Sequence, residues 1–287
     1  MSQVNKIKPR RSLLFIPANR PDRFDKALNS GADMVCIELE DGVAYAQKEM
    51  ARDNMVNFFS NPGKVPAHCE ILVRINGLED AHGQADLEAI LALPQKPDAV
   101  MIPKIRHAGE ISMLDKKLAE HAPEMALHVL IETAEALEHA SAIAAASQRL
   151  ELLLFGGVDL ATELRATTGW EALSYARGRI VHAAALAGLD VMDMPYLAVD
   201  NPDGLAAEAA RARDMGFGGK AAIHPAQLSV IHQAFTPSAA EVEQAKRILA
   251  AYADAPGGVV VLDGRLVEKP VILKMQYILA IAEAVQA

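Results

Sequence analysis

The chain has 287 residues, of which 51% are hydrophobic, and a formal net charge of −9. This composition supports a large core and argues against disorder, and the negative charge argues against a general nucleic-acid-binding protein. The two cysteines, Cys36 and Cys69, are too few for a disulfide framework. Cys36 lies in an apolar run, where we expect a buried small residue.

The chain begins with a short basic stretch, MSQVNKIKPRR. It contains no signal-peptide hydrophobic region, and no later apolar run reaches the roughly 18 residues of a membrane-spanning helix. We expect this stretch to be a frayed tail and the protein to be cytoplasmic, without membrane or nucleic-acid partners.

Eight short apolar segments recur along the chain, each bounded by turn or helix-start signals. A continuously apolar run is typical of a strand buried on both faces of a parallel sheet. The predicted strands are residues 12–18, 34–41, 70–77, 99–105, 127–133, 151–160, 190–199 and 219–225.

Helical patterns lie between these segments, several with a Pro near the start and a Gly just beyond the end. The predicted helices are residues 21–30, 47–59, 82–93, 109–121, 134–146, 174–187, 201–215 and 225–235. Eight strands alternating with helices predict a parallel sheet with right-handed crossovers, and the number favours a closed TIM (β/α)₈ barrel. No GxGxxG follows the first strand, which disfavours a dinucleotide-binding fold.

The last fifty or so residues extend beyond the eighth unit, so we divide the chain into a barrel over residues 1–236 and an extension over residues 237–287. The extension predicts a helix over 237–254, a break at 255–258, a short strand over 259–262, a turn at Asp263-Gly264 and a helix over 270–286. We expect a lid or a subunit-exchange element; the alternative is a packing extension that closes the bottom of the barrel.

Polar side chains gather at the C-terminal ends of the predicted strands, which meet on one face of a barrel. Charges at the tips of apolar strands are costly unless they are paired, metal-bound or solvated, so the set predicts a site. Its members are Glu38, Glu40, Asp41, Arg74, Asn76, Lys104, Glu132, Asp159, Asp193, Tyr196, Asp200, Lys220 and His224.

Glu132 and Asp159 end the neighbouring fifth and sixth strands. Two carboxylates without a nearby Cys or His suit a hard cation, and Mg²⁺ typically takes one or two carboxylates with waters and substrate oxygens. The alternative is that the two acids are separate caps or ion-pair partners. Gly156 and Gly157, just before Asp159, let backbone or ligand come close.

Arg74 ends the third strand, and its planar fork matches a carboxylate or a thioester-enolate oxygen. The alternative is a structural salt bridge to Glu40 or Asp41. We interpret His224 as a core histidine in preference to a base, and Lys220 as the partner of a strand acid in preference to a substrate contact.

Several motifs, in order, resemble the citrate lyase β-subunit-like family of the HpcH/HpaI aldolase and malyl-CoA lyase group. The resemblance covers residues 11 to 271 and rests on RSLLFIPANRPDRFDKAL, ADMVCIELEDGV, VRING, MIPKI, IET, LLFGGVDLA, GFGGKAAIHPAQ and VVVLDGRLVEKPV. The family often has DLEDAV where this chain has Glu38 and Gly42, and often ends its lid in Ile-Asp where this chain has Val267-Glu268.

The resemblance implies a TIM barrel that uses Mg²⁺ to break a carbon–carbon bond in an acyl-CoA or acyl-carrier thioester. Glu132 and Asp159 would hold the metal, and Arg74 would contact the keto acid or the forming enolate. Glu40 and Asp41 would hold Arg74 and the metal-bound waters. Asp263 would lie on a lid that reaches a neighbouring subunit and act as acid/base, in a homotrimer or a dimer of trimers.

The expected substrate is a 3-hydroxy-3-carboxyacyl-CoA of malyl- or citramalyl-CoA type, cleaved to acetyl-CoA or a homologue and an α-keto acid. Gly157 and backbone N–H groups after Asp159 would accommodate the keto acid. Arg20, Arg23 and Lys26 are candidates for the CoA phosphates, or else a solvated face. The alternatives are a citrate lyase β subunit acting on citryl-carrier protein and a non-catalytic binding protein.

Overall fold

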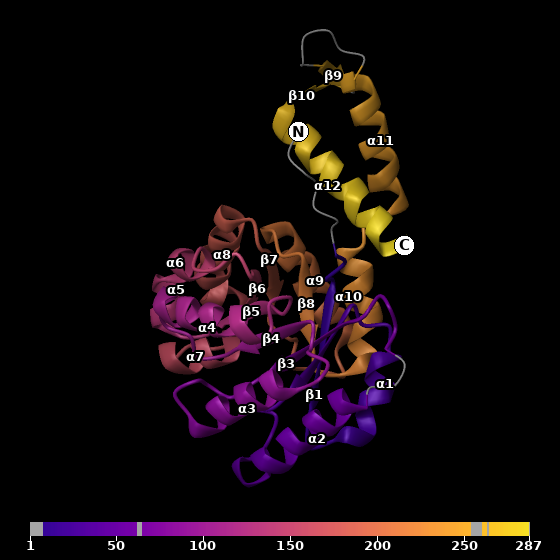
Figure 1. The fold of residues 1–287 in the computed structure, drawn as a ribbon. Helices are drawn as coiled ribbons and strands as arrows, with labels where there is room; N and C mark the ends of the chain where they lie inside the picture. Colours follow the sequence, from indigo (N-terminus) through magenta and orange to yellow (C-terminus); the bar gives the residue numbers. More distant parts are fainter. Residues whose placement is uncertain (1–7, 62–64, 254–259, 263, 287) are drawn as a thin grey trace. The chain divides into compact units, whose positions relative to one another are not determined.

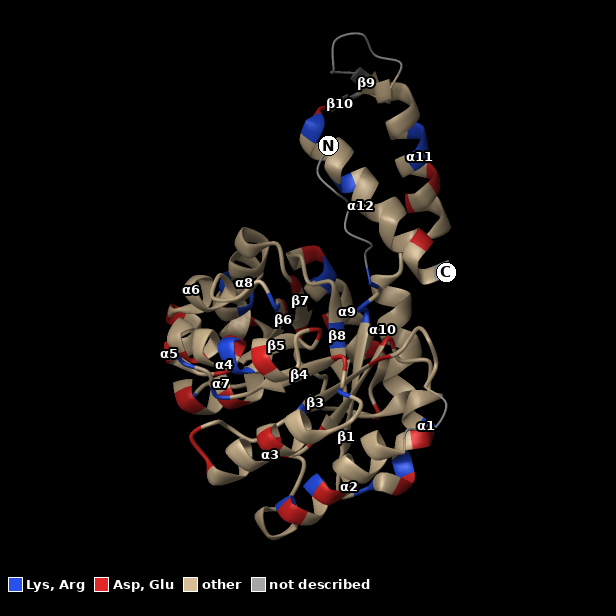
Figure 2. Ribbon diagram, viewed as in Figure 1, with Lys and Arg blue, Asp and Glu red and all other residues tan. Residues whose placement is uncertain are grey.

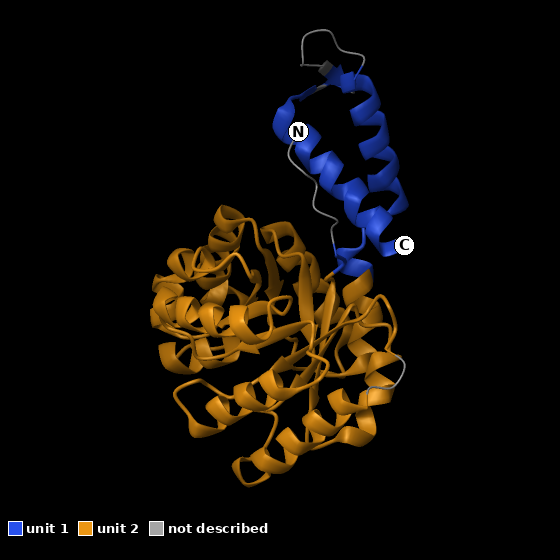
Figure 3. Cartoon of the chain, viewed as in Figure 1, with its two compact units in different colours: residues 1–9, 233–287 blue, residues 10–232 orange. Residues whose placement is uncertain are grey.

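The computed structural model describes residues 8–61, 65–253, 260–262 and 264–286, and the chain divides into two compact units (Figure 3). One unit is residues 10–232, and the other joins residues 1–9 to residues 233–287. No helix within these described ranges is long and apolar enough to cross a membrane.

The larger unit is built around eight parallel strands that pair in chain order, and the last pairs with the first to close a barrel (Figure 1). The TIM-barrel prediction is therefore confirmed. The strands are β1 (Ser12–Pro17), β2 (Met34–Glu38), β3 (Glu70–Arg74), β4 (Ala99–Ile102), β5 (Ala126–Ile131), β6 (Leu150–Phe155), β7 (Asp190–Asp193) and β8 (Gly219–Ala222).

Helices surround the strands, and acidic and basic residues are interspersed along them (Figure 2). The helices are α1 (Phe24–Leu28), α2 (Lys48–Ser60), α3 (Ala81–Ala92), α4 (Ala108–His121), α5 (Ala134–Glu138), α6 (Ala140–Ala144), α7 (Gly157–Leu164), α8 (Trp170–Ala187), α9 (Pro202–Met215) and α10 (Leu228–Phe235). Two differ from expectation. The helix predicted over 134–146 breaks at His139, and α7 occupies residues predicted as the end of a strand.

The barrel interior follows the two-residue period of its strands, because alternate side chains of a strand point to the same face. Met34 and Cys36 of β2, like Leu72 of β3, belong to a fully buried apolar cluster. Continuing each series by two residues brings Glu38 and Arg74 to the C-terminal end of the interior. The expectation that Cys36 is buried is confirmed.

A cluster of ion pairs on Arg10 lies at the opposite, N-terminal end of the strands. Its guanidinium pairs with Glu70 at 2.8 Å, with Asp190 at 2.9 Å and with Glu151, and its side chain is only 6% exposed. Arg11 pairs with Asp33 at 2.7 Å. The expectation of a frayed basic tail is therefore wrong for these two arginines, while residues 1–7 lie outside the described part of the chain.

Replacing Arg10 with Met is expected to lower the free energy of unfolding by about 3 kcal/mol, because three carboxylates lose their shared cation in a partly buried place. Urea denaturation followed by circular dichroism measures the change. Arg23 is exposed at the end of the short 3₁₀ helix before α1 and provides the matched control, since R23M should change stability by less than about 0.5 kcal/mol. Equal stabilities of R10M and R23M would contradict the structural role of Arg10.

The smaller unit contains α11 (Ala239–Ala253), the strands β9 (Val260–Leu262) and β10 (Arg265–Val267), which pair antiparallel, and α12 (Lys269–Gln286). Its own apolar cluster includes Ile248, Val267 and Met275. Strand β10 was not predicted. The predicted break at 255–258 and Asp263 lie outside the described residues.

Candidate metal and substrate site

A cavity of about 370 Å³ opens at the C-terminal ends of the barrel strands. Its walls are mostly apolar, with Phe15 and Leu154 among them, and a few polar groups converge on it. The polar side chains that line it are Glu38, Asp41, Arg74, Glu132 and Asp159, together with the backbone of Gly156 and Gly157. Five of the thirteen residues predicted for the site therefore line one cavity, and they include Arg74 and both candidate metal ligands.

Arg74 is the last residue of β3, and two carboxylates fix its guanidinium. Its Nε pairs with Glu38, its Nη1 lies 3.1 Å from Glu40 Oε2, and the Phe15 ring centroid lies 5.0 Å from its Cζ. Burial disfavours the charged form, but the two carboxylates outweigh burial and raise the pKa of Arg74. The guanidinium is thus a permanent, oriented cation. Of its two predicted partners, Glu40 is observed; the stronger pair, with Glu38, was not foreseen.

Glu38 and Gly42, the two departures from the family pattern, lie next to each other in the structure. A Cβ atom on residue 42 would lie 2.9 Å from Glu38 Cγ, closer than carbon atoms approach without a shift. Gly42 therefore leaves room for the Glu38 side chain, whose carboxylate pairs with Arg74.

Lys104 places its ammonium among three carboxylates. Its Nζ lies 2.6 Å from Asp159 Oδ1, 3.5 Å from Glu132 Oε1 and 3.7 Å from Glu40 Oε1. Burial works against its charge, but the carboxylates outweigh burial and raise the pKa of Lys104. A cation is therefore held where the predicted metal ligands converge.

The backbone of Lys104 also contributes to this arrangement. Its φ of 57° is left-handed, which is uncommon for a side chain of this size, and its N–H donates to Glu132 Oε1 at 2.7 Å. Strained residues of this kind are held at functional sites by their surroundings. The MIPKI motif places Lys104 at the end of a strand, but nothing in the sequence signals its left-handed backbone or its contacts.

Glu132 has one oxygen atom with no observed partner. It is 1% exposed, and its Oε2 accepts no hydrogen bond from any described residue. Burial raises the pKa of its carboxyl group, and the Lys104 ammonium opposes this shift. A buried carboxylate oxygen without a donor is costly, and a bound cation would satisfy it.

Gly156 allows Glu132 to occupy this place. A Cβ atom on residue 156 would overlap Glu132 Cβ and would lie 2.9 Å from Glu132 Oε2. The sequence predicted a close approach to the backbone of this glycine pair. At Gly156 the approaching residue is Glu132, a candidate metal ligand. Gly157 is equally constrained, because its Cβ would overlap Met194 Sδ and lie 2.8 Å from Phe155 Cε1.

Asp159 lies in the first turn of α7, which begins at Gly157, and not in a strand. The N–H groups of a helix's first turn have no acceptor within the helix. Gly157, Val158 and Asp159, which form this turn, also line the cavity. That backbone N–H groups after Asp159 hold the keto acid stays a prediction.

Glu40 is buried beside this cluster, and its backbone is fixed by Lys48, whose Nζ donates to the carbonyl oxygens of Leu39 at 2.8 Å and Glu40 at 2.6 Å. Burial raises the pKa of Glu40 to about 8, Arg74 offsets part of this shift, and Glu132 and other acids add to it. Glu40 therefore changes its protonation state near neutral pH.

In the absence of Mg²⁺, the stability of the wild type relative to E40Q should fall as the pH rises from 5 to 8. The pKa of Glu40 is higher in the folded chain than its ordinary 4.5, so its contribution is fully present below about pH 4.5 and is lost as pH rises through about 8. The slope of this stability difference against pH is at most about 1.4 kcal/mol per pH unit.

Urea denaturation of the wild type and E40Q at several pH values measures the slope. E49Q, a change at an exposed acid on α2, should follow the wild type; parallel curves for wild type and E40Q would refute the assignment.

The remaining candidates have other environments. Lys220 is fully buried and pairs with Asp193 at 2.6 Å and Glu208 at 2.8 Å, as expected. His224 is not a core residue: it is exposed, and its Nδ1 accepts from the Ala226 N–H. Arg20 is exposed and paired with Asp22, and Lys26 is exposed on α1.

Comparison with known proteins gives the site a context. The family model described as HpcH/HpaI aldolase/citrate lyase matches residues 11–225. A (3S)-malyl-CoA thioesterase of Cereibacter sphaeroides is 37% identical over 284 residues, covering 97% of this chain and 96% of the relative. The citrate lyase subunit beta of Escherichia coli K12 is 32% identical over 293 residues, covering 98% and 96%.

Solved structures agree with this. CitE of Mycobacterium tuberculosis in complex with magnesium, acetoacetate and coenzyme A superposes with a TM-score of 0.80 at 32% identity, covering 95% of this chain and 98% of that one. RipC of Yersinia pestis gives a TM-score of 0.71 at 38% identity, covering 81% and 97%. The resemblance noted in the sequence is confirmed: the chain belongs to the HpcH/HpaI aldolase/citrate lyase family.

Proposed function

We propose that the protein is a Mg²⁺-dependent carbon–carbon lyase that cleaves a malyl- or citramalyl-CoA-type thioester to an acyl-CoA, such as acetyl-CoA, and an α-keto acid. One observation carries the proposal: a single cavity combines a fixed guanidinium with two carboxylates, one of which has a buried oxygen that accepts no hydrogen bond from the described residues. Arg74 supplies the cation for an enolate, and Glu132 with Asp159 supplies the ligands for a metal.

Glu132 and Asp159 fit Mg²⁺, because both offer oxygen atoms and the Lys104 ammonium lies 3.5 Å from Glu132 Oε1 and 2.6 Å from Asp159 Oδ1, which supports a preference for a cation between them. Magnesium in the CitE complex supports the same choice. When bound, the ion would act as a Lewis acid and template for the hydroxyl and carboxylate of the substrate. Lys104 would then give up its place between the two acids.

Arg74 would stabilise the negative charge that develops during cleavage. The hydroxyl proton leaves to a base, the bond between C2 and C3 breaks, and its electron pair forms a thioester enolate while C3 becomes the keto carbon. Glu38 and Glu40 hold the guanidinium in one place before reaction, so Arg74 would stabilise the charge without reorganisation. The first-turn N–H groups of α7 would bind the carboxylate of the keto acid.

Asp263 would protonate the enolate carbon, from a lid that the subunits of a homotrimer or a dimer of trimers share. D263N should lower kcat at least about 100-fold and leave Mg²⁺ affinity unchanged, because general acid catalysis contributes about 10²–10⁴-fold. Steady-state kinetics and calorimetric Mg²⁺ titration measure the two effects. An unchanged kcat would reduce the lid to a structural element.

A second candidate is thioester hydrolysis, favoured by the thioesterase name of a relative that covers nearly the whole chain. A citrate lyase β subunit is a third, favoured by the Escherichia coli relative. Arg20 and Lys26 are proposed contacts for CoA phosphates, and their loss should raise KM for a CoA thioester without changing its kcat.

The test is a panel of malyl-, β-methylmalyl-, citramalyl- and citryl-thioesters, on CoA and on carrier protein, each with and without Mg²⁺. Release of acetyl-CoA or propionyl-CoA from a CoA substrate, dependent on Mg²⁺, supports the proposal. Activity only with the citryl-carrier thioester would assign the chain to citrate lyase. No turnover of any substrate would favour the alternative of a non-catalytic binding protein.

A further inference from the structure

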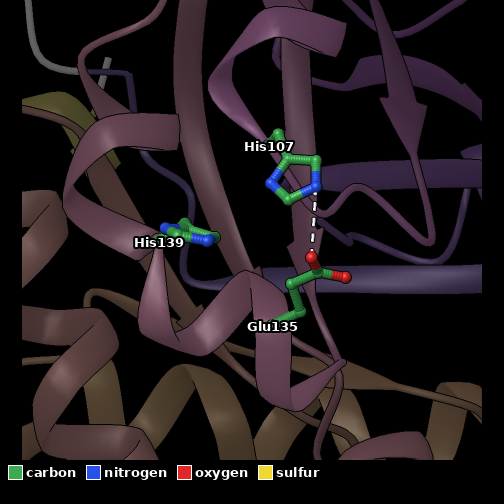
Figure 4. Close-up of side chains that lie close together, drawn as sticks. All are labelled: His107, Glu135 and His139. Carbon is green, nitrogen blue, oxygen red and sulfur yellow. Dashed lines mark ion pairs between the residues drawn. The ribbon is translucent and has the colours of Figure 1, made fainter.

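We propose that His107, Glu135 and His139 form a second metal site, for a divalent transition ion of the Zn²⁺ type, on the loops and helices that follow β4 and β5 (Figure 4). One ligand atom from each side chain lies within 4.8 Å of those of the other two. None of the three belongs to the cavity described above.

The local backbone brings the three side chains together. Glu135 and His139 are four residues apart, and the His139 N–H donates to the Glu135 carbonyl at 3.1 Å, so both lie on one face of a helical turn. His107 precedes the first turn of α4. Its Nε2 lies 3.1 Å from Glu135 Oε1, and its ring centroid lies 5.2 Å from that of His139.

The donor set selects the kind of ion. Two imidazoles and a carboxylate are ligands of Zn²⁺ and its neighbours in the transition series, with water in the open position. The all-oxygen pair Glu132 and Asp159 suits a hard ion instead. The side chains of His107 and Glu135 are 54% and 46% exposed, so they have room to close around an ion and admit water.

The guanidinium of Arg106 lies near the cluster but does not occupy the place of the proposed ion. Arg106 Nε is 3.8 Å from Glu135 Oε2, whereas Oε1 of the same carboxylate is the atom that faces His107. Another grouping among the described residues, Glu70, His128 and Glu151, is different, because the guanidinium of Arg10 pairs with both of its acids. It already holds its cation, and we assign no metal there.

An ion at this place would link two segments that are already joined by a hydrogen bond at Glu132, a residue of the cavity wall. His107 follows Lys104 by three residues, and Glu135 follows Glu132 by three. The Lys104 N–H donates to Glu132 Oε1 at 2.7 Å. A bound ion would therefore hold the same two segments from outside and raise the stability of the metal-bound protein.

The test is calorimetric titration of the purified full chain with Zn²⁺ in excess Mg²⁺, which occupies hard-ion sites. The wild type should bind one equivalent at least about 10-fold more tightly than H107A/H139A, and Zn²⁺ should raise its Tm by several degrees but not that of the double variant. H121A, which removes another exposed histidine of α4, should behave as the wild type.

The substituted side chains are exposed, so the variants should keep the circular dichroism spectrum of the wild type. His107 also caps α4, so H107A/H139A should have a slightly lower metal-free Tm, and the change in Tm caused by Zn²⁺ is measured against each protein's own metal-free value. Equal Zn²⁺ affinity in the wild type and H107A/H139A would overturn the proposal. So would binding that survives in H107A/H139A but is lost in D159N, because the ion would then occupy the cavity.

Discussion

Replacing Asp159 with Asn is expected to lower kcat for the thioester substrate by about 1,000-fold or more and to weaken Mg²⁺ binding, while the fold is retained. The change keeps the shape of the side chain but removes the negative charge that, with Glu132, would hold the ion. Asp159 is 38% exposed and lies in the first turn of α7, so neither core packing nor a strand depends on it.

The matched control is E163Q, which removes an exposed acid from the same helix. The Glu163 carboxylate accepts from the Ala134 N–H at 3.0 Å, a role that the Gln oxygen retains. Kinetics at several Mg²⁺ concentrations, with calorimetry for affinity, separate the two variants. Near-normal turnover by D159N, or equal losses in D159N and E163Q, would show that Asp159 is not a metal ligand.

Replacing Gly156 with Ala is expected to weaken Mg²⁺ binding by about 100-fold through Glu132, although residue 156 carries no functional group. The new methyl group would overlap Glu132 Cβ and crowd Oε2 at 2.9 Å. Either Glu132 leaves its position or the start of α7 moves, and both displace the ligand pair. A loss of stability of about 1–3 kcal/mol should accompany the change.

Gly178 provides the control for this substitution, because a Cβ atom there meets nothing within 4 Å and the residue lies inside α8. G178A should bind Mg²⁺ as the wild type does and be equally or more stable, since Ala favours a helix. Calorimetric titration and thermal denaturation are the measurements. Wild-type Mg²⁺ affinity in G156A would mean that Glu132 does not need its observed position.

The barrel could be predicted because short sequence patterns determine its strands and helices. Buried parallel strands produce continuous apolar runs, and their inward residues repeat every two positions, which brings Glu38, Arg74 and Glu132 to one end. Helix α7 was missed because Gly156 and Gly157 suggest a turn, and only the packing against Glu132 and Met194 explains why glycine is needed there.

The detailed contacts depend on tertiary structure and could not be predicted. Glu38 and Glu40 both end near Arg74, but which oxygen faces the guanidinium depends on the register of β2 and β3. The left-handed backbone of Lys104 is fixed by its hydrogen bond to Glu132, 28 residues away in sequence. Arg10 belongs to the basic stretch that was predicted to be a tail, and its three acids come from strands far along the chain.

The most direct test of carbon–carbon cleavage is to quantify all products of malyl- or citramalyl-CoA, by NMR and by thiol assay, with and without Mg²⁺. The proposal predicts acetyl-CoA and an α-keto acid in equal amounts, no free CoA thiol, and no turnover when Mg²⁺ is removed by a chelator. Free CoA with an intact hydroxy acid would show hydrolysis of the thioester and contradict the lyase proposal.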